Sequence, residues 1–186
     1  MQVESFSVPH DAQDPVGFLI RTHAGNIGFL TDLGHATKLV LERVRPANVL
    51  VLETNHDVKM LQDDPRRPWS LKQRILSRHG HLSNEAAADA AEVIMSDGLR
   101  KLYLGHLSRD CNRPEIALRT ISTRLEKIGA THVNVELTSQ HKILPTFELR
   151  GIGSPLATAS SAPLALRETA PSPASPGEQL LNLFPA

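Results

Sequence analysis

Histidine and aspartate side chains follow short apolar runs at several places in the chain. Asp32 follows the run at 29–31, His106 follows the run at 102–104, and His10 lies in a polar turn upstream. Side chains that leave strand ends together can meet although they are far apart in the sequence. A hydrolytic metal site needs neutral imidazoles, carboxylates and an open position for water, so these three residues are predicted to bind metal. The alternative for each histidine is a structural role in a hydrogen-bonded turn.

Two further polar clusters could belong to the same site. Asn55, His56 and Asp57 come directly after the apolar run 49–53, at the strand end where ligand sites of open α/β sheets occur. For His56 and Asp57, a turn held by side-chain hydrogen bonds explains the sequence equally well. His81 precedes Ser83 and Asn84, either of which can cap a helix, so His81 is predicted to lie where a helix N-terminus favours an anion.

The elements that must position these residues alternate between strands and helices. A hairpin is expected from strands at 16–20 and 27–31, and 112–115 resembles a capping box that opens a helix ending at Gly129. Such alternation indicates an α/β fold. The further expected strands are 49–53, 101–104 and 133–137, and the further expected helices are 36–43, 69–76 and 85–96, with a short helical turn at 59–61.

A cationic stretch lies in the middle of the chain. It comprises Arg66, Arg67, Lys72, Arg74 and Arg78. One interpretation is an ordinary solvated helix face, and the other is a rim that binds phosphates.

Composition limits the other possibilities. The 186 residues are 40% hydrophobic, which suits one domain with additional segments. Twenty basic and twenty acidic residues cancel, so overall charge favours neither a nucleic acid nor a membrane as partner. The single cysteine excludes an intrachain disulfide, and no signal peptide or apolar span is recognisable. A cytoplasmic protein is therefore expected. The sequence gives no indication of an oligomeric state. The expected organisation is a domain at 1–148, a disordered linker rich in Ser, Ala and Pro at 149–177, and a docking peptide at 178–186.

Taken together, the motifs resemble the metallo-β-lactamase fold, an αββα sandwich. Within it, the chain is similar to the branch of hydrolases typified by the WalJ/YycJ proteins, which is related to the phosphoribosyl cyclic phosphodiesterases. The resemblance covers 6–147. The strings that carry it are VPHDA at 8–12, DPVG at 14–17, TDLG at 31–34, ETNHD at 53–57, ML at 60–61, GHLSN at 80–84 and GHLS at 105–108.

The resemblance implies roles for these residues. His10 and His106 would be metal ligands, Asp32 would bridge two metals, and His81 would be a proton donor or phosphate ligand at the leaving group. Asn55, His56 and Asp57 would form a supporting shell that orients ligands or contacts phosphate. The complete fold would hold two divalent ions, zinc or manganese, which activate water and stabilise charge on a phosphodiester.

One departure from the family pattern is large. Members carry a His-x-His-x-Asp-His string that supplies most metal ligands, whereas here the only histidines spaced by two are His79 and His81. We therefore expect the chain to be the C-terminal half of the fold. Its three remaining ligands would hold one metal loosely or none, and its exposed sheet edges would favour association.

The function that the resemblance implies is a metal-dependent phosphodiesterase acting on DNA, most plainly a 5′-to-3′ exonuclease of replication or repair. The cationic stretch would contact the DNA backbone. The tail residues Gln179, Leu180, Leu183 and Phe184 are similar to peptides that dock in the bacterial sliding clamp, although a weakly apolar chain end explains them too. Two alternatives stay open: a hydrolase of small phosphodiesters or other esters, and an inactive half-domain that acts only by binding.

Overall fold

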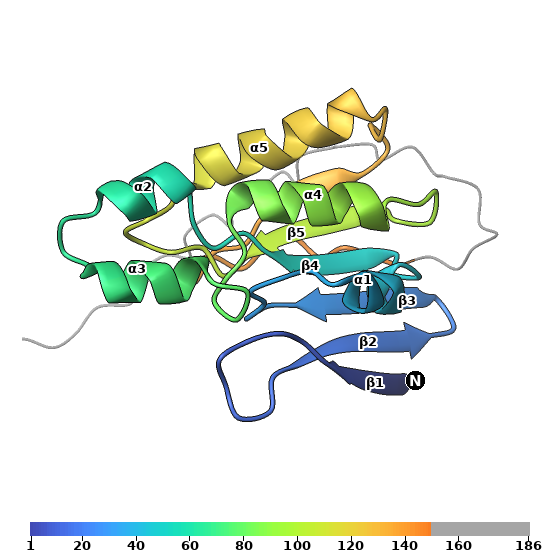
Figure 1. Cartoon of the computed structure of the whole chain (residues 1–186). Helices are drawn as coiled ribbons and strands as arrows, with labels where there is room; N and C mark the ends of the chain where they lie inside the picture. The colour runs from blue at the N-terminus through green and yellow to red at the C-terminus, as the bar shows by residue number, and fades with distance from the viewer. Residues whose placement is uncertain (150–186) are drawn as a thin grey trace, which may run out of the picture. The chain divides into compact units, whose positions relative to one another are not determined.

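The computed structural model describes residues 1–149. Its six strands form one sheet (Figure 1). The strands lie in chain order: β1 (Gln2–Ser7), β2 (Val16–Thr22), β3 (Gly25–Leu30), β4 (Val49–Glu53), β5 (Lys101–Gly105) and β6 (Asn134–Leu137). The first three strands are antiparallel, and β3 to β6 are parallel. The carboxyl ends of β3, β4 and β5 therefore meet at one edge of the sheet.

Five helices connect the strands of the described part: α1 (Lys38–Val44), α2 (Val58–Asp63), α3 (Trp69–Leu76), α4 (Asn84–Ile94) and α5 (Pro114–Lys127). The free amides at the starts of α1, α2 and α4 donate hydrogen bonds to the side chains of Thr37, Asp57 and Ser83. Gly129, at φ 75°, follows the last turn of α5, and its amide bonds to the carbonyl of Glu126.

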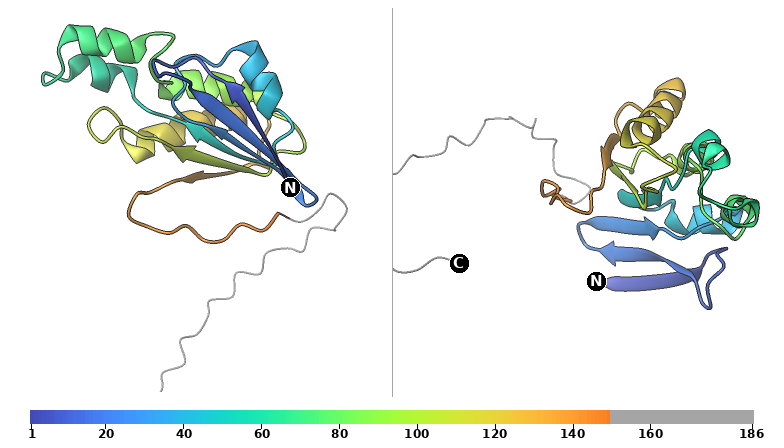
Figure 2. Two further views of the ribbon diagram at one scale, coloured as in Figure 1. Left: turned by 90° about the horizontal axis from the view of Figure 1, so that it is seen from below. Right: turned by 90° about the vertical axis from the view of Figure 1, so that its left-hand side faces the viewer.

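The core lies on one face of the sheet. Leucines that alternate along the central strands, such as Leu50 and Leu102, pack with α1, α4 and α5. The alanines of α4, including Ala87 and Ala88, are buried, and α4 packs closely against α5. The helices lie on this face in the side view (Figure 2). The opposite face carries the half-exposed Phe18 and Phe29.

The α/β class predicted from the sequence is confirmed, with two local corrections. Strand β1 was not expected, because Gln2–Ser7 is mostly polar and lies at the exposed sheet edge. The capping box at 112–115 was wrong: the N-cap of α5 is Arg113, without a side-chain cap, and Asn112 is buried elsewhere.

The linker expected at 149–177 and the docking peptide expected at 178–186 lie outside the described residues, apart from residue 149. Within residues 1–149, no helix combines the length and apolar character that a membrane span requires.

Candidate metal centre

Two residues of the candidate site adopt an unusual backbone conformation. Asp32, which follows β3, has φ 55°, and His106, which follows β5, has φ 57°. In residues 1–149 they are the only non-glycine residues with positive φ. Such strain persists only where the surrounding structure enforces it, and it concentrates at functional sites.

The structure brings the three predicted ligands together with a fourth residue. The Oδ1 atom of Asp32 lies 3.7 Å from Nε2 of His10 and 3.8 Å from Nδ1 of His106. The ring of His81 lies between the two other imidazoles, with centroid distances of 4.8 Å to His10 and 5.1 Å to His106. His81 was predicted as a proton donor or phosphate ligand, and its position suits either that role or a role as a ligand.

Glu53, at the end of β4, is the buried centre of this cluster. Its Oε1 accepts hydrogen bonds from Nδ1 of His81 at 2.9 Å and from the amide of Leu82 at 3.1 Å. Its Oε2 accepts from Nδ1 of His106 at 3.3 Å and from the amide of Leu33 at 3.1 Å. Burial favours the neutral acid, but the hydrogen bonds from His106 and His81 outweigh it and hold the pKa of Glu53 below its usual value. The hydrogen bond to Glu53 in turn raises the pKa of His106.

Sequence reasoning did not single out Glu53 as a site residue. An acid that ends a continuous apolar run reads as the polar boundary of a strand. The signal that could have found it is burial: its side chain is fully inaccessible, and an ionised buried acid needs several hydrogen-bond donors.

The hydrogen bonds fix which ring nitrogen each histidine offers. His10 donates from Nδ1 to the carbonyl oxygen of Gly80 at 2.8 Å, because a carbonyl can only accept. His81 and His106 place Nδ1 against Glu53. For His10 and His81, Nε2 is therefore left to ligate a metal or carry a proton, the arrangement typical of metal-binding histidines. For His106, Nδ1 is also the nitrogen that lies 3.8 Å from Oδ1 of Asp32.

This donor set fits a divalent ion. Ligand atoms of His10, Asp32 and His81 lie within 4.8 Å of one another, and so do those of Glu53, His81 and His106. We interpret Glu53 as an orienting carboxylate, because both of its oxygens already accept two hydrogen bonds. Imidazole and carboxylate groups are ligands that divalent metal ions take in proteins.

The loops that carry these residues are joined by backbone hydrogen bonds. The amide of Gly34 donates to Pro9 at 2.8 Å, and the amide of Asp11 donates to His79 at 2.9 Å. Arg74 of α3 forms an ion pair with Asp11, and this hydrogen bond lowers the pKa of the Asp11 carboxyl. A Cβ at Gly80 would clash with the carbonyl oxygen of Ile75, so only glycine allows this loop to pack here.

The three residues after β4 have different roles. Asn55 donates from Nδ2 to the carbonyl oxygen of His106 at 3.0 Å, as a supporting residue would. Asp57 caps α2 by accepting from the amide of Met60 at 2.8 Å, which is the structural alternative. His56 is 1% exposed, and neither ring nitrogen has a hydrogen-bond partner within the described part of the chain. Direct contact of His56 with phosphate, one of its predicted roles, is therefore wrong for this conformation; burial lowers its pKa to about 4.

Most of the predicted cationic stretch is already paired with protein groups. Arg66 and Arg67 both pair with Asp64 and Asp110, and Arg74 pairs with Asp11. Lys72 is buried and donates to the carbonyl oxygen of Gln62 at 2.7 Å, which corrects its assignment as a surface contact to DNA. Arg78 is exposed and has no ion pair within residues 1–149.

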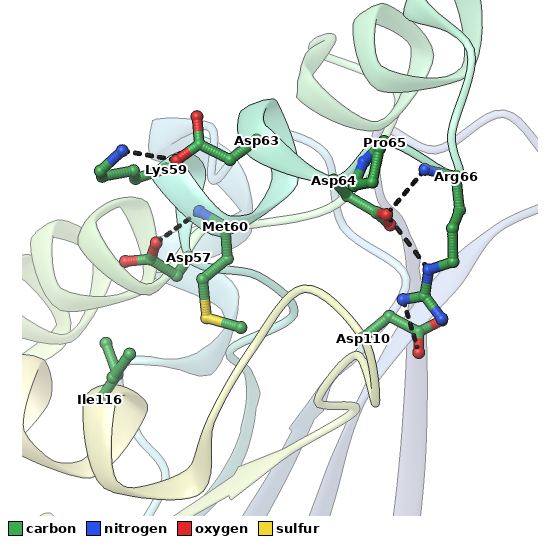
Figure 3. Close-up of a pocket in the computed structure, with 9 residues that line it drawn as sticks. All are labelled: Asp57, Lys59, Met60, Asp63, Asp64, Pro65, Arg66, Asp110 and Ile116. Carbon is green, nitrogen blue, oxygen red and sulfur yellow. Dashed lines mark hydrogen bonds and ion pairs between the residues drawn. The ribbon is translucent and has the colours of Figure 1, made fainter.

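A separate hollow of about 510 Å³ lies beside α2 (Figure 3). Its acids are largely neutralised, since Asp63 pairs with Lys59, and Asp64 and Asp110 pair with Arg66. It contains none of the clustered histidines, so it is not part of the candidate metal centre.

Comparison with known proteins supplies the family context. The pattern of the Beta-lactamase superfamily domain matches residues 1–107. The chain is 40% identical over 129 residues to exodeoxyribonuclease YycJ of Bacillus anthracis, which covers 69% of this chain and 48% of that protein. It is 38% identical over 125 residues to exodeoxyribonuclease WalJ of Streptococcus pneumoniae, which covers 67% of this chain and 46% of that protein. The chain thus spans about half the length of the curated relatives it matches.

A solved structure shows the same fold. The metallo-β-lactamase fold protein YhfI from Bacillus subtilis superposes with a TM-score of 0.52 at 14% identity, over 73% of this chain and 45% of that one.

Proposed function

Because the chain belongs to the beta-lactamase superfamily, we propose that it functions in metal-dependent phosphodiester hydrolysis, with DNA as substrate and 5′-to-3′ exonuclease action in replication or repair. The membership confirms the family resemblance stated from the sequence. The observation that carries the proposal is a pair of overlapping groups of possible metal ligands, His10 with Asp32 and His81, and His106 with His81 and the buried Glu53.

In this proposal, His10, Asp32 and His106 hold metal. A bound divalent ion would supply an activated water and stabilise the charge that builds on the phosphate oxygens. Glu53 orients the ring of His106 through its contact with Nδ1 at 3.3 Å. Asp32 supplies the carboxylate that faces both histidines.

His81 is proposed to hold the proton for the departing oxygen. Its Nδ1 is bound to Glu53, so in the charged imidazolium Nε2 carries the transferable proton. Proton donation from Nε2 leaves a neutral ring with Nδ1 still protonated and bound to Glu53.

DNA as substrate is supported by the names of the relatives, both called exodeoxyribonucleases. Among the predicted backbone contacts, Arg78 is the exposed cation without an ion pair in the described chain, and it lies next to the loop that carries His81. The other exposed arginines would have to exchange protein carboxylates for phosphates.

The test is hydrolysis and metal content of the purified 186-residue chain. We expect bound zinc or manganese by elemental analysis and release of nucleotides from linear duplex DNA. Asp32→Asn should abolish both metal binding and nucleotide release. Blocking the 5′ ends of the DNA should stop nucleotide release, and blocking the 3′ ends should not. A chain without metal and without cleavage of any phosphodiester would overturn the proposal. Cleavage of small phosphodiesters alone would replace DNA as the substrate.

A second proposal concerns the tail, which the structure does not describe. We propose that Gln179, Leu180, Leu183 and Phe184 dock in the apolar pocket of a sliding clamp. A tether of this kind raises the effective concentration of an enzyme at DNA without a large interface. Phe184→Ala should abolish binding to the purified clamp in a titration; no binding by the unaltered chain would remove this proposal.

A further inference from the structure

Helix α3 exposes large apolar side chains and buries a lysine. Trp69 at its start is 59% exposed, Leu71 is 37% exposed, and Lys72 is its one buried residue. With α2, the helix projects beyond the strand ends of the sheet (Figure 1). An exposed indole offers a flat face on which another planar group can stack.

The opposite end of α3 is built into the candidate metal centre. The amide of His81 donates to the carbonyl oxygen of Ile75 at 3.0 Å, and Arg74 pairs with Asp11 beside His10. Gly80, which accepts the hydrogen bond from His10, packs against the last turn of α3. The helix is therefore a short, fixed arm that leads from the centre to Trp69.

Within the described residues, the arm offers a polyanion one unpaired positive charge, that of Arg78, because Lys72 is buried and Arg74 pairs with Asp11. From 66 to 84 the chain has no aspartate or glutamate, although basic and acidic residues are equal in number over its whole length. Arg78, exposed and without an ion pair in the described chain, lies at the end nearest the centre. An aromatic platform combined with unpaired positive charge is the arrangement by which proteins bind single-stranded nucleic acid without reading its sequence.

We propose that the arm binds an unpaired strand of the nucleic-acid substrate, with a base stacked on Trp69 and a phosphate on Arg78. The inference rests on the proposed function, since it assigns a second contact to the same substrate. Eight helical residues at about 1.5 Å each span about 12 Å, which corresponds to three or four nucleotides at about 3.4 Å per stacked nucleotide. Trp69 should therefore engage strands of about four nucleotides or more and be out of reach of a dinucleotide.

The first experiment measures binding without catalysis. Trp69 is the only tryptophan of the full chain, so its fluorescence reports on this position directly. With a chelator present, single-stranded oligodeoxynucleotides of about eight nucleotides should quench the emission, and a dinucleotide at equal nucleotide concentration should not. Absence of quenching by the longer strand would overturn the inference.

Variants separate stacking from folding. Trp69→Ala should weaken oligonucleotide binding by about fivefold to 150-fold, and Trp69→Phe should retain most of it, because phenylalanine still offers a ring. Val93→Ala on α4 is the matched control, since Val93 is 55% exposed on a helix without this charge, and it should leave binding unchanged. Equal affinity of Trp69→Ala and the unaltered chain would contradict the inference.

Activity then distinguishes the inference from the proposed function. If the unaltered chain hydrolyses both bis-p-nitrophenyl phosphate and single-stranded DNA, Trp69→Ala should lose activity on DNA alone. If Trp69→Ala still hydrolyses DNA at the rate of the unaltered chain, the proposed function is retained and the role of the arm in it is contradicted. If the unaltered chain shows quenching, Trp69→Ala binds more weakly and neither chain hydrolyses either substrate, the arm is supported and the proposed function is contradicted. Sedimentation that shows Trp69-dependent dimers and no DNA binding would assign the surface to a second copy of the chain and overturn the inference.

Discussion

At the scale of single residues, Glu53 holds the candidate centre together. One buried carboxylate orients two histidines and binds the amides of two loops, one after β3 and one before α4. Glu53 ends β4, which lies between β3 and β5, the strands that Asp32 and His106 follow. Its contacts with the amide of Leu33 and with the His106 ring help to hold the two strained residues in place.

Glu53→Gln tests this orienting role. The amide keeps one acceptor but turns its NH₂ group toward donors of the site, so we expect a loss of about 1–3 kcal/mol in unfolding free energy. Metal affinity should fall about 10-fold to 100-fold, as for other residues that orient metal ligands. Titration with a chelator of known affinity measures the second effect. Glu126→Gln, at an exposed position of α5, should change neither quantity.

His56 makes stability sensitive to acid. Its pKa is about 4 in the folded chain and about 6.5 when unfolded, so the unfolded state binds the proton first. The stabilisation is therefore complete above about pH 6.5 and is lost as the pH falls toward 4.

His56→Leu should reduce the loss of stability between about pH 7 and about pH 4.5 by about 2–3 kcal/mol. Near pH 7 the substitution should cost little, because no hydrogen bond to the ring exists within the described residues. Denaturant unfolding at the two pH values measures the difference. A variant as acid-sensitive as the unaltered chain would contradict burial of a neutral ring.

Sequence alone identified His10, Asp32 and His106 because each follows or precedes a strand, and the structure brings them together. Their roles as ligands stay predictions. Glu53 and the position of His81 between two other imidazoles depend on how three neighbouring strands align, which no local pattern encodes. The paired state of Arg66 and Arg67 likewise depends on Asp110, which is distant in sequence.

At the scale of elements, the parallel strands were predictable and the polar connections were not. The run that became β4 is apolar from Val49 to Leu52, and both β4 and β5 are mostly buried, as central parallel strands are. Asn112 looked like a local helix cap, yet its amide donates to the carbonyl oxygens of Thr54 and Asn55 and pairs with the buried Asn84. Tertiary hydrogen bonds to the loop after β4 take the place of the local bond.

The loop between α3 and α4 depends on Gly80. Alanine there would clash with the carbonyl oxygens of Ile75 and Arg74, so the last turn of α3 or the His81 loop must move. We expect Gly80→Ala to cost about 3 kcal/mol in unfolding free energy and to weaken metal binding through His10 and His81.

Gly98→Ala is the matched control for that substitution. A Cβ at Gly98 would meet its nearest neighbour, Asn48, at 3.5 Å, which is an ordinary contact. Its stability should stay within about 0.5 kcal/mol of the unaltered chain. Equal stability of the two alanine variants in denaturant would show that the Gly80 loop adapts without cost.

At the scale of the whole described domain, the sheet has one face without helices. The register places Phe18 opposite Phe29, Phe29 opposite Val51, and Val51 opposite Tyr103, so these side chains form a continuous row. Phe18 and Phe29 are each 38% exposed. In a sandwich fold such a face packs against a second sheet, and half the length of the relatives lies beyond the matched part.

We therefore expect the 186-residue chain to self-associate through this face in solution, because exposed contiguous apolar surface is unfavourable in water. Phe29→Lys should shift the chain toward monomer, since burying an unpaired ammonium in an apolar contact costs several kcal/mol. Val93→Lys places the same charge on α4, which covers the other face, and should leave association unchanged. Sedimentation velocity over a range of concentrations separates the three chains. Association that persists equally in Phe29→Lys would exclude this face as the contact and leave the edge strand β1 as the alternative, because its unpaired backbone groups can recruit another strand.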